Sequence, residues 1–230
     1  MYARATRRVR TGLRNLDDLL GGGFMSGEVN LIYGEATTGK TTLALTTALN
    51  YLKSSKASNV YYIDSDNKLN TERLVNIAEP RGLELLRNIK TYTPSDFGEQ
   101  EQIIENLPNL EPDDLVILDS VTGLYRVETG DEDQTYRTNK ELNRQLGYIT
   151  EITRRKGVTM ILTGQVRSVL DTNQLEPVAP RLLSYWSSVI LKLEKMAATG
   201  LRQITLEKPE RTSRSIVLRL GEHGFTEDGK

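Results

Sequence analysis

The chain has 230 residues, with 30 lysines and arginines against 31 aspartates and glutamates, so its formal net charge is −1. This balance excludes a uniformly basic, nucleic-acid-coating protein and an acidic, tail-like protein. The chain has no cysteine, which excludes disulfides, thiolate metal sites and a cysteine nucleophile, and its single histidine disfavours zinc. A chain of this length can bury one sizeable core, so we expect a single domain over residues 1–230.

The chain begins with a basic leader, residues 1–14, which holds five arginines and no acidic residue. Two interpretations compete: a solvated, partly frayed segment, which we favour, or a nucleic-acid contact. No hydrophobic stretch follows that would make a signal peptide, and no apolar run reaches the length of a membrane span. We therefore expect a cytoplasmic protein without a membrane partner.

Short apolar segments rich in β-formers alternate with helical periods along most of the chain. This alternation predicts an α/β fold, with a mainly parallel sheet flanked by helices. The predicted strands cover residues 29–33, 60–63, 89–92, 115–118 and 158–163. The predicted helices cover residues 41–53, 70–79, 97–107 and 137–156. In the last helix, apolar residues recur every three or four positions, which indicates a face that packs on the sheet.

The C-terminal part changes character. Residues 189–193, 201–206 and 215–220 are predicted strands with connections too short for crossover helices. We expect them to pair antiparallel and to extend one edge of the sheet.

The strongest local signal is a glycine-rich loop, GEATTGKTT, between the first predicted strand and the first predicted helix. It fits the pattern Gly, four residues, Gly-Lys-Ser/Thr, in the strand–loop–helix context that this pattern requires. Backbone amides and the positive end of the helix would face phosphates, Lys40 would neutralise the β and γ phosphates, and Thr41 would ligate Mg²⁺. The predicted ATP-binding residues are Gly34, Glu35, Ala36, Thr37, Thr38, Gly39, Lys40, Thr41 and Thr42.

Three further residues follow predicted strands and complete the candidate chemistry. Asp119 ends the run LVILD and is the candidate Mg²⁺ carboxylate. Asp66 follows the second predicted strand, and Gln165 follows the fifth. A carboxylate can orient an attacking water, and an amide can bond a γ-phosphate or a water.

In this order, LDDLLGGGF, GEATTGKTT, YIDSDNKLNTERL, LVILDS and LTGQV resemble the RecA/RadA recombinase superfamily, and most closely its archaeal RadB family. The resemblance covers residues 11–226. It implies a RecA-like P-loop ATPase core without an N-terminal helix-hairpin-helix domain, and ATP and Mg²⁺ as cofactors. It implies Lys40, Asp66 and Gln165 as the catalytic residues, with Gln165 as the γ-phosphate sensor. It implies Thr41 and Asp119 as the Mg²⁺ ligands.

One position departs from the superfamily pattern, because Asp66 stands where a catalytic glutamate is usual. Its side chain is one methylene shorter, so the carboxylate falls roughly 1–1.5 Å short, and a misplacement on that scale can cost about a hundredfold in rate. We therefore expect intact ATP binding with slow hydrolysis.

In the superfamily, two loops face DNA, and here they would cover residues 122–138 and 166–184. The first is rich in carboxylates, which makes it a poor phosphate contact, and the second is nearly neutral and long enough to be disordered. A basic hairpin around EKPERTSR is either solvated, a finger that reaches a neighbouring subunit's γ-phosphate, or a DNA-binding surface. The candidate contacts to DNA or to a neighbouring subunit are Arg167, Arg181, Lys208, Arg211 and Arg214.

The leading hypothesis is a RadB-like accessory protein of homologous recombination and DNA repair, with weak Mg²⁺-dependent ATPase activity. Its implied partners are single-stranded or branched DNA, a RadA-type recombinase and further copies of itself. Two alternatives stay open: a KaiC-like, ring-forming ATPase or autokinase, and a nucleotide-gated adaptor in which hydrolysis is incidental.

Overall fold

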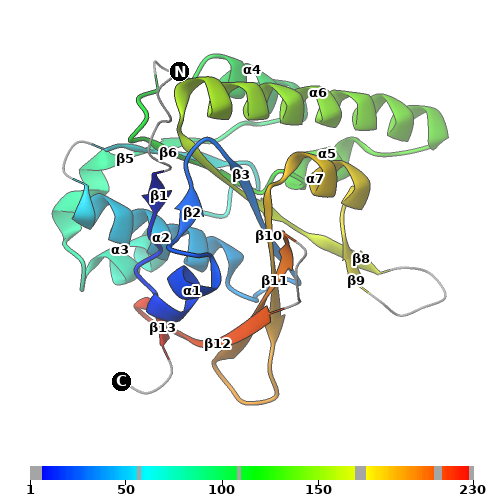
Figure 1. The fold of residues 1–230 in the computed structure, drawn as a ribbon. Helices are drawn as coiled ribbons and strands as arrows, with labels where there is room; N and C mark the ends of the chain where they lie inside the picture. Colours follow the sequence, from blue (N-terminus) through cyan, green and yellow to red (C-terminus); the bar gives the residue numbers. More distant parts are fainter. Residues whose placement is uncertain (1–6, 56–57, 108–109, 169–174, 210–213, 228–230) are drawn as a thin grey trace.

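The computed structural model describes residues 7–55, 58–107, 110–168, 175–209 and 214–227. Within them, a nine-stranded sheet has the order β13-β12-β11-β10-β3-β7-β6-β4-β5 (Figure 1). Its predicted parallel strands are all present: β3 (Val29–Gly34), β4 (Val60–Asp64), β5 (Ile89–Tyr92), β6 (Leu115–Asp119) and β7 (Thr159–Gly164). Their carboxyl ends meet at one edge, where Asp64 pairs with Asp119 and Tyr33 with Gly164.

The remaining strands of this sheet form the predicted C-terminal extension: β10 (Val189–Lys195), β11 (Leu201–Lys208), β12 (Arg214–Gly221) and β13 (Gly224–Glu227). The antiparallel pairing of β10 with β11 and of β11 with β12 is confirmed. On its other side β10 pairs parallel with β3, which the sequence did not indicate. The extension therefore joins the sheet beside the strand that leads into the glycine-rich loop.

Helices cover both faces of the sheet. On one face α2 (Lys40–Ser54) packs with α3 (Thr71–Ala78), the 3-10 helix η1 (Leu83–Asn88) and α1 (Arg14–Leu19) (Figure 1). On the other, α6 (Glu132–Lys156) packs with α4 (Phe97–Glu105), α5 (Gly123–Glu128) and α7 (Pro180–Trp186). Each face has its own apolar core cluster. The predicted apolar stripe of α6 is buried, with Leu142, Leu146 and Ile149 fully inaccessible to solvent.

The two predicted loops contain more regular structure than expected. The helix predicted from residue 137 begins at Glu132, because the Asp131 side chain accepts a hydrogen bond from the Gln134 amide at 2.8 Å and caps it. Asp131, Glu132 and Asp133 of the first loop thus lie at the start of α6, where negative charge is favourable. The second loop contains α7 and a small hairpin of β8 (Val166–Ser168) and β9 (Leu175–Pro177), while residues 169–174 lie outside the described residues.

The basic leader belongs to the fold from residue 7 onward, so the expected fraying is wrong for residues 7–14, although Arg10 and Arg14 are exposed to solvent as expected. β1 (Arg8–Val9) pairs with β2 (Phe24–Met25), and Val9 is buried. Arg8 donates to the Leu20 and Gly23 carbonyls, and Arg7 forms an ion pair with Asp113. Arg4 lies outside the described residues. In the described part of the chain, no helix combines the length and the apolar character needed to cross a membrane.

Candidate nucleotide site and the adjoining groove

The glycine-rich loop connects β3 to α2, as its strand–loop–helix pattern predicts. Gly39 caps α2 in the left-handed conformation, with φ 102°, and a Cβ there would lie 2.9 Å from the Phe225 ring. Only glycine therefore meets both the backbone and the packing requirement. Phe225 lies in β13, so the C-terminal extension packs directly against the start of α2.

Lys40 folds back over the loop and donates to the Gly34 and Glu35 carbonyls at 2.9 and 2.8 Å. Burial lowers the pKa of Lys40, and the nearby Asp119 and Asp66 carboxylates oppose that shift. From outside the loop, Arg202 of β11 donates to the Thr38 and Thr37 carbonyls at 3.1 and 3.4 Å. Sequence reasoning missed Arg202, because it follows the loop by more than 160 residues and carries no local pattern.

Asp119 ends β6 with its side chain almost fully buried, and three hydroxyl groups donate to its carboxylate. Thr41 donates to Oδ2 at 2.6 Å, Tyr62 donates to the same oxygen at 2.5 Å, and Thr163 donates to Oδ1. Burial and the Asp119 charge raise the pKa of Tyr62, which keeps the phenol protonated as a donor. Tyr62 and Thr163 belong to the two strands that flank β6, so only the strand order identifies them.

The two predicted Mg²⁺ ligands, Thr41 and Asp119, are therefore adjacent. A hydroxyl and one carboxylate are oxygen donors of the kind that Mg²⁺ uses, together with substrate phosphates and water. Among the described residues there is no group of three or more His, Cys, Asp or Glu side chains that would hold a metal without such help. The donor set fits a magnesium ion that arrives with its nucleotide.

Asp66 and Gln165, 99 residues apart, are in direct contact. Gln165 Nε2 donates to Asp66 Oδ2 at 2.9 Å, and Ser120 donates to Asp66 Oδ1 at 3.2 Å. Lys68 Nζ lies 3.5 Å from Asp66 Oδ2. Gln165 Oε1 in turn accepts a hydrogen bond of 2.7 Å from Arg126 of α5, a residue that had no predicted role.

The candidate DNA contacts do not form one surface. Arg167 pairs with Glu176 across the β8–β9 hairpin, with 2.7 Å between Nη2 and Oε1, and Arg181 is exposed at the start of α7. Lys208 donates to the Ser184 carbonyl at 2.9 Å near the end of α7. Arg214 donates to the Leu19 carbonyl of α1 at 3.0 Å. Arg211 lies outside the described residues, as does the rest of the hairpin tip, residues 210–213.

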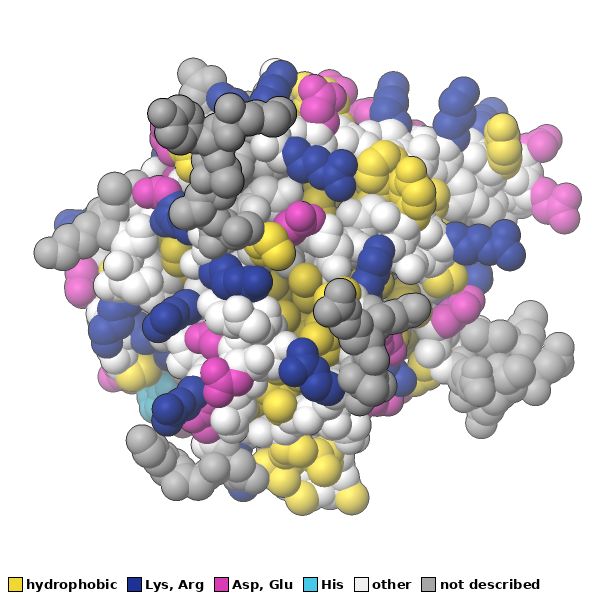
Figure 2. All heavy atoms as spheres, viewed as in Figure 1, with side chains coloured by type: hydrophobic (Ala, Val, Ile, Leu, Met, Phe, Trp, Pro, Cys, Tyr) yellow, Lys and Arg dark blue, Asp and Glu magenta, His cyan; other side chains and the backbone are white. Residues whose placement is uncertain are grey.

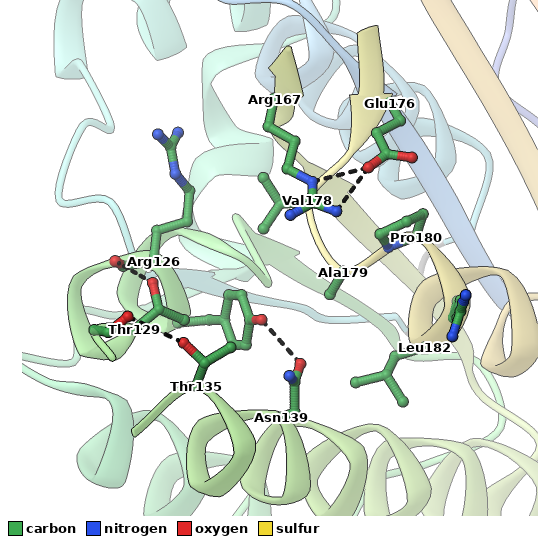
Figure 3. A pocket seen from close by; sticks show the side chains of 13 residues that line it. Arg126, Thr129, Thr135, Asn139, Arg167, Glu176, Val178, Ala179, Pro180 and Leu182 are labelled. Atoms are coloured by element: carbon green, nitrogen blue, oxygen red, sulfur yellow. Dashed lines mark hydrogen bonds and ion pairs between the residues drawn. The ribbon is translucent and has the colours of Figure 1, made fainter. Parts of the chain in front are cut away.

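Arg167 and Arg181 do meet at a groove of about 820 Å³ between α5, the start of α6, the β8–β9 hairpin and α7. Figure 3 shows Arg126 rising from α5 on one side and the Arg167–Glu176 pair on the other. Inside, the Tyr125 hydroxyl donates to Asn139 at 2.9 Å. On the molecular face that Figure 2 shows, basic side chains are interspersed with acidic ones.

Comparison with known proteins identifies the family that this chain resembles. Residues 3–228 match the model of the Rad51 family. The DNA repair and recombination protein RadB of Thermococcus kodakarensis is 39% identical over 203 residues, 86% of this chain and 88% of that protein. RadB of Methanococcus maripaludis is 36% identical over 194 residues, 84% and 87% of the two chains. A crystal structure of the RadB recombinase is 34% identical, with a TM-score of 0.79, and the match covers 95% of this chain and 99% of that one.

Proposed function

The chain belongs to the RadB DNA repair and recombination proteins of the Rad51 family, and on that premise we propose that it is a slow, Mg²⁺-dependent ATPase that binds DNA. The observation that carries the proposal is the contact of the Thr41 hydroxyl with the Asp119 carboxylate, 2.6 Å apart, beside a glycine-rich loop and Lys40. The loop after β3 and the start of α2 supply groups that suit phosphates, and Asp119 at the end of β6 supplies a carboxylate that suits magnesium. A nucleotide with its magnesium ion needs both sets of groups close together. The role is that of an accessory protein in homologous recombination.

Each residue has a defined task in this proposal. The loop amides and Lys40 bind the phosphates, and Thr41 and Asp119 hold Mg²⁺, which neutralises charge on the phosphates. Tyr62 and Thr163 fix the Asp119 carboxylate in place. Asp66 orients the attacking water and accepts its proton, with Gln165 beside it.

Slow turnover follows from the surroundings of Asp66. Each of its two oxygens already accepts a hydrogen bond, one from Ser120 and one from Gln165. Asp66 Oδ1 also packs directly against Gly123 at the start of α5, where an added Cβ would collide with it. A carboxylate held by these contacts must release one of them before it can turn toward an attacking water.

DNA binding is proposed for the groove between α5, α6, the β8–β9 hairpin and α7. Arg126, Arg167 and Arg181 bring three guanidinium groups to it, the groups best suited to phosphates. Acidic residues at the start of α6 limit how far a strand can extend in that direction. Lys208, Arg211 and Arg214 stay candidates for a second DNA contact or a neighbouring subunit.

The test measures ATP hydrolysis and DNA binding together, with and without single-stranded and branched DNA, at several salt concentrations. Lys40→Ala should abolish hydrolysis, and Arg155→Ala on the outer face of α6 should change neither activity. Each lost phosphate contact should reduce the salt dependence of the log affinity by about 0.7–0.9. If the protein binds neither single-stranded nor branched DNA at low salt, the proposed role in recombination is refuted.

A nucleotide-gated adaptor is the second candidate, and the double restraint on Asp66 favours it. In that case ATP sets a conformation that a RadA-type recombinase recognises, and hydrolysis is incidental. Lys40→Ala would then weaken partner binding, whereas Asp66→Asn would not.

We also propose a cytoplasmic location, and self-association is to be measured in the same experiments.

A further inference from the structure

Lys68 lies beside the proposed catalytic carboxylate, and no role was predicted for it from the sequence. Its Nζ is 3.5 Å from Asp66 Oδ2, and both residues line a cavity of about 450 Å³. Arg126 also lines this cavity, but its guanidinium donates to the Gln165 amide oxygen. In the described part of the chain, Lys68 is therefore the cation that forms an ion pair with Asp66.

A buried carboxylate holds the backbone of Lys68 in place. Asp64, at the end of β4, is 5% exposed and accepts hydrogen bonds from the Lys68 amide at 3.1 Å and the Leu69 amide at 2.7 Å. Asn67 has the left-handed conformation, with φ 50°, and closes a turn in which its amide donates to the Asp64 carbonyl. Since a buried carboxylate needs such donors, the turn that carries Lys68 is fixed at the sheet edge where Asp66 lies.

The side chain of Lys68, by contrast, can move. It is 75% exposed, and its ammonium group is carried on a flexible four-carbon stem. Its 3.5 Å separation from Asp66 exceeds the roughly 2.7–2.9 Å of a charge-assisted hydrogen bond, and exposed ion pairs are weak. The ammonium can therefore leave Asp66 for another anion nearby.

The charge of Lys68 also reaches the phosphate-binding lysine. Burial lowers the pKa of Lys40, the Asp119 and Asp66 carboxylates oppose that shift, and the positive charge of Lys68 adds to it. The two ammonium groups are thus close enough to repel each other. A γ-phosphate bound by Lys40 would relieve this repulsion, because it would bring negative charge to both groups.

We propose that Lys68 is a catalytic cation supplied by the same chain, which leaves Asp66 and contacts the γ-phosphate oxygens in the transition state. This inference rests on the proposed function and adds a residue to it. In the step, the water oxygen bonds to the γ-phosphorus, the bond from that phosphorus to ADP breaks with its electron pair left on ADP, and Asp66 accepts the water's proton. Protonation removes the charge that holds Lys68, so the ammonium is free to stabilise the transferring group.

The decisive variants are Lys68→Met, which removes the charge at similar side-chain length, and Lys68→Arg, which keeps a positive charge. Lys53→Met is the matched control, because Lys53 is exposed at the far end of the helix that begins with Lys40. In steady-state ATP hydrolysis with Mg²⁺, kcat of Lys68→Met should fall by about 10- to 100-fold with unchanged KM. Lys68→Arg should lose less, and Lys53→Met should match the unaltered protein. An unchanged or higher kcat of Lys68→Met overturns the proposal, since Lys68 would then at most restrain Asp66.

A second measurement needs no turnover. ADP with aluminium fluoride mimics the phosphoryl group in transfer, and ADP alone lacks that group. Because Lys68 would contact this group only in the transition state, Lys68→Met should weaken the affinity for ADP–aluminium fluoride by about 10- to 100-fold and leave the affinity for ADP unchanged. Equal effects on both ligands, or no effect on either, overturn the proposal.

Mixing the variants tests whether Lys68 acts within its own chain. Lys40→Ala subunits keep Lys68 but should not hydrolyse ATP, so adding them to Lys68→Met protein should leave its hydrolysis rate unchanged. A rise in the rate would mean that Lys68 serves the nucleotide of a neighbouring subunit, which contradicts the proposal.

The two proposals fail in different ways. If the unaltered protein does not hydrolyse ATP, the proposed ATPase function fails. If it hydrolyses ATP and Lys68→Met does so equally fast, the role of Lys68 is overturned and the proposed function stands.

Discussion

Replacing Asp66 by glutamate tests directly why hydrolysis should be slow. The carboxylate of Asp66 accepts hydrogen bonds from Ser120 and Gln165, and its Oδ1 packs against Gly123 at the start of α5. A side chain one methylene longer cannot keep both bonds, so its carboxylate must extend into the cavity of about 450 Å³ beside it. It would thereby gain the roughly 1–1.5 Å that aspartate lacks.

This geometry predicts a higher kcat and a lower free energy of unfolding for Asp66→Glu. Since misplacement by about 1 Å can cost a hundredfold, kcat of Asp66→Glu should rise by about 10- to 100-fold. Loss of one hydrogen bond to a charged group should lower the free energy of unfolding by about 1.5–3 kcal/mol. For a chain of this length, that corresponds to a Tm about 3–12 °C lower.

The assay is steady-state ATP hydrolysis with Mg²⁺, combined with thermal unfolding of the same samples. Asp66→Asn serves as the control, since it keeps the size of the side chain but removes the base, and it should lose hydrolysis while retaining ATP binding. A folded Asp66→Glu protein with unchanged kcat would refute the positional argument. Full activity of Asp66→Asn would remove Asp66 from the mechanism.

Three further predictions concern the supports of the site. Tyr62→Phe removes the buried hydroxyl that donates to Asp119 and should lower the free energy of unfolding by about 1.5–3 kcal/mol, as measured by urea titration. An unchanged urea midpoint would show that this hydrogen bond does not stabilise the fold. Arg202→Ala should weaken ATP binding about tenfold with little effect on kcat, because the glycine-rich loop loses the hydrogen bond from Arg202 to the Thr38 carbonyl. Titration calorimetry measures the ATP affinity. Leu146→Ala should cost about 2–5 kcal/mol of stability, whereas Arg155→Ala should cost almost nothing.

The sequence by itself determined the features that depend on neighbours along the chain. The glycine-rich loop needs a strand before it and a helix after it, and both are encoded within 26 residues, from Val29 to Ser54. Asp119 follows an apolar strand, and the strand pattern places that strand in a parallel sheet. The RadB resemblance also rests on such short segments in order, and the comparisons confirm it.

Only the tertiary structure decided which distant residues meet. Gln165 reaches Asp66 across 99 positions and Arg126 across 39, because the segments that follow β4, β6 and β7 lie at the same edge of the sheet. The acidic run expected to be a loop is a helix start, since Asp131 caps it and its charges suit the helix dipole. Local patterns specify strands and helices, but the strand order selects the partners of each side chain.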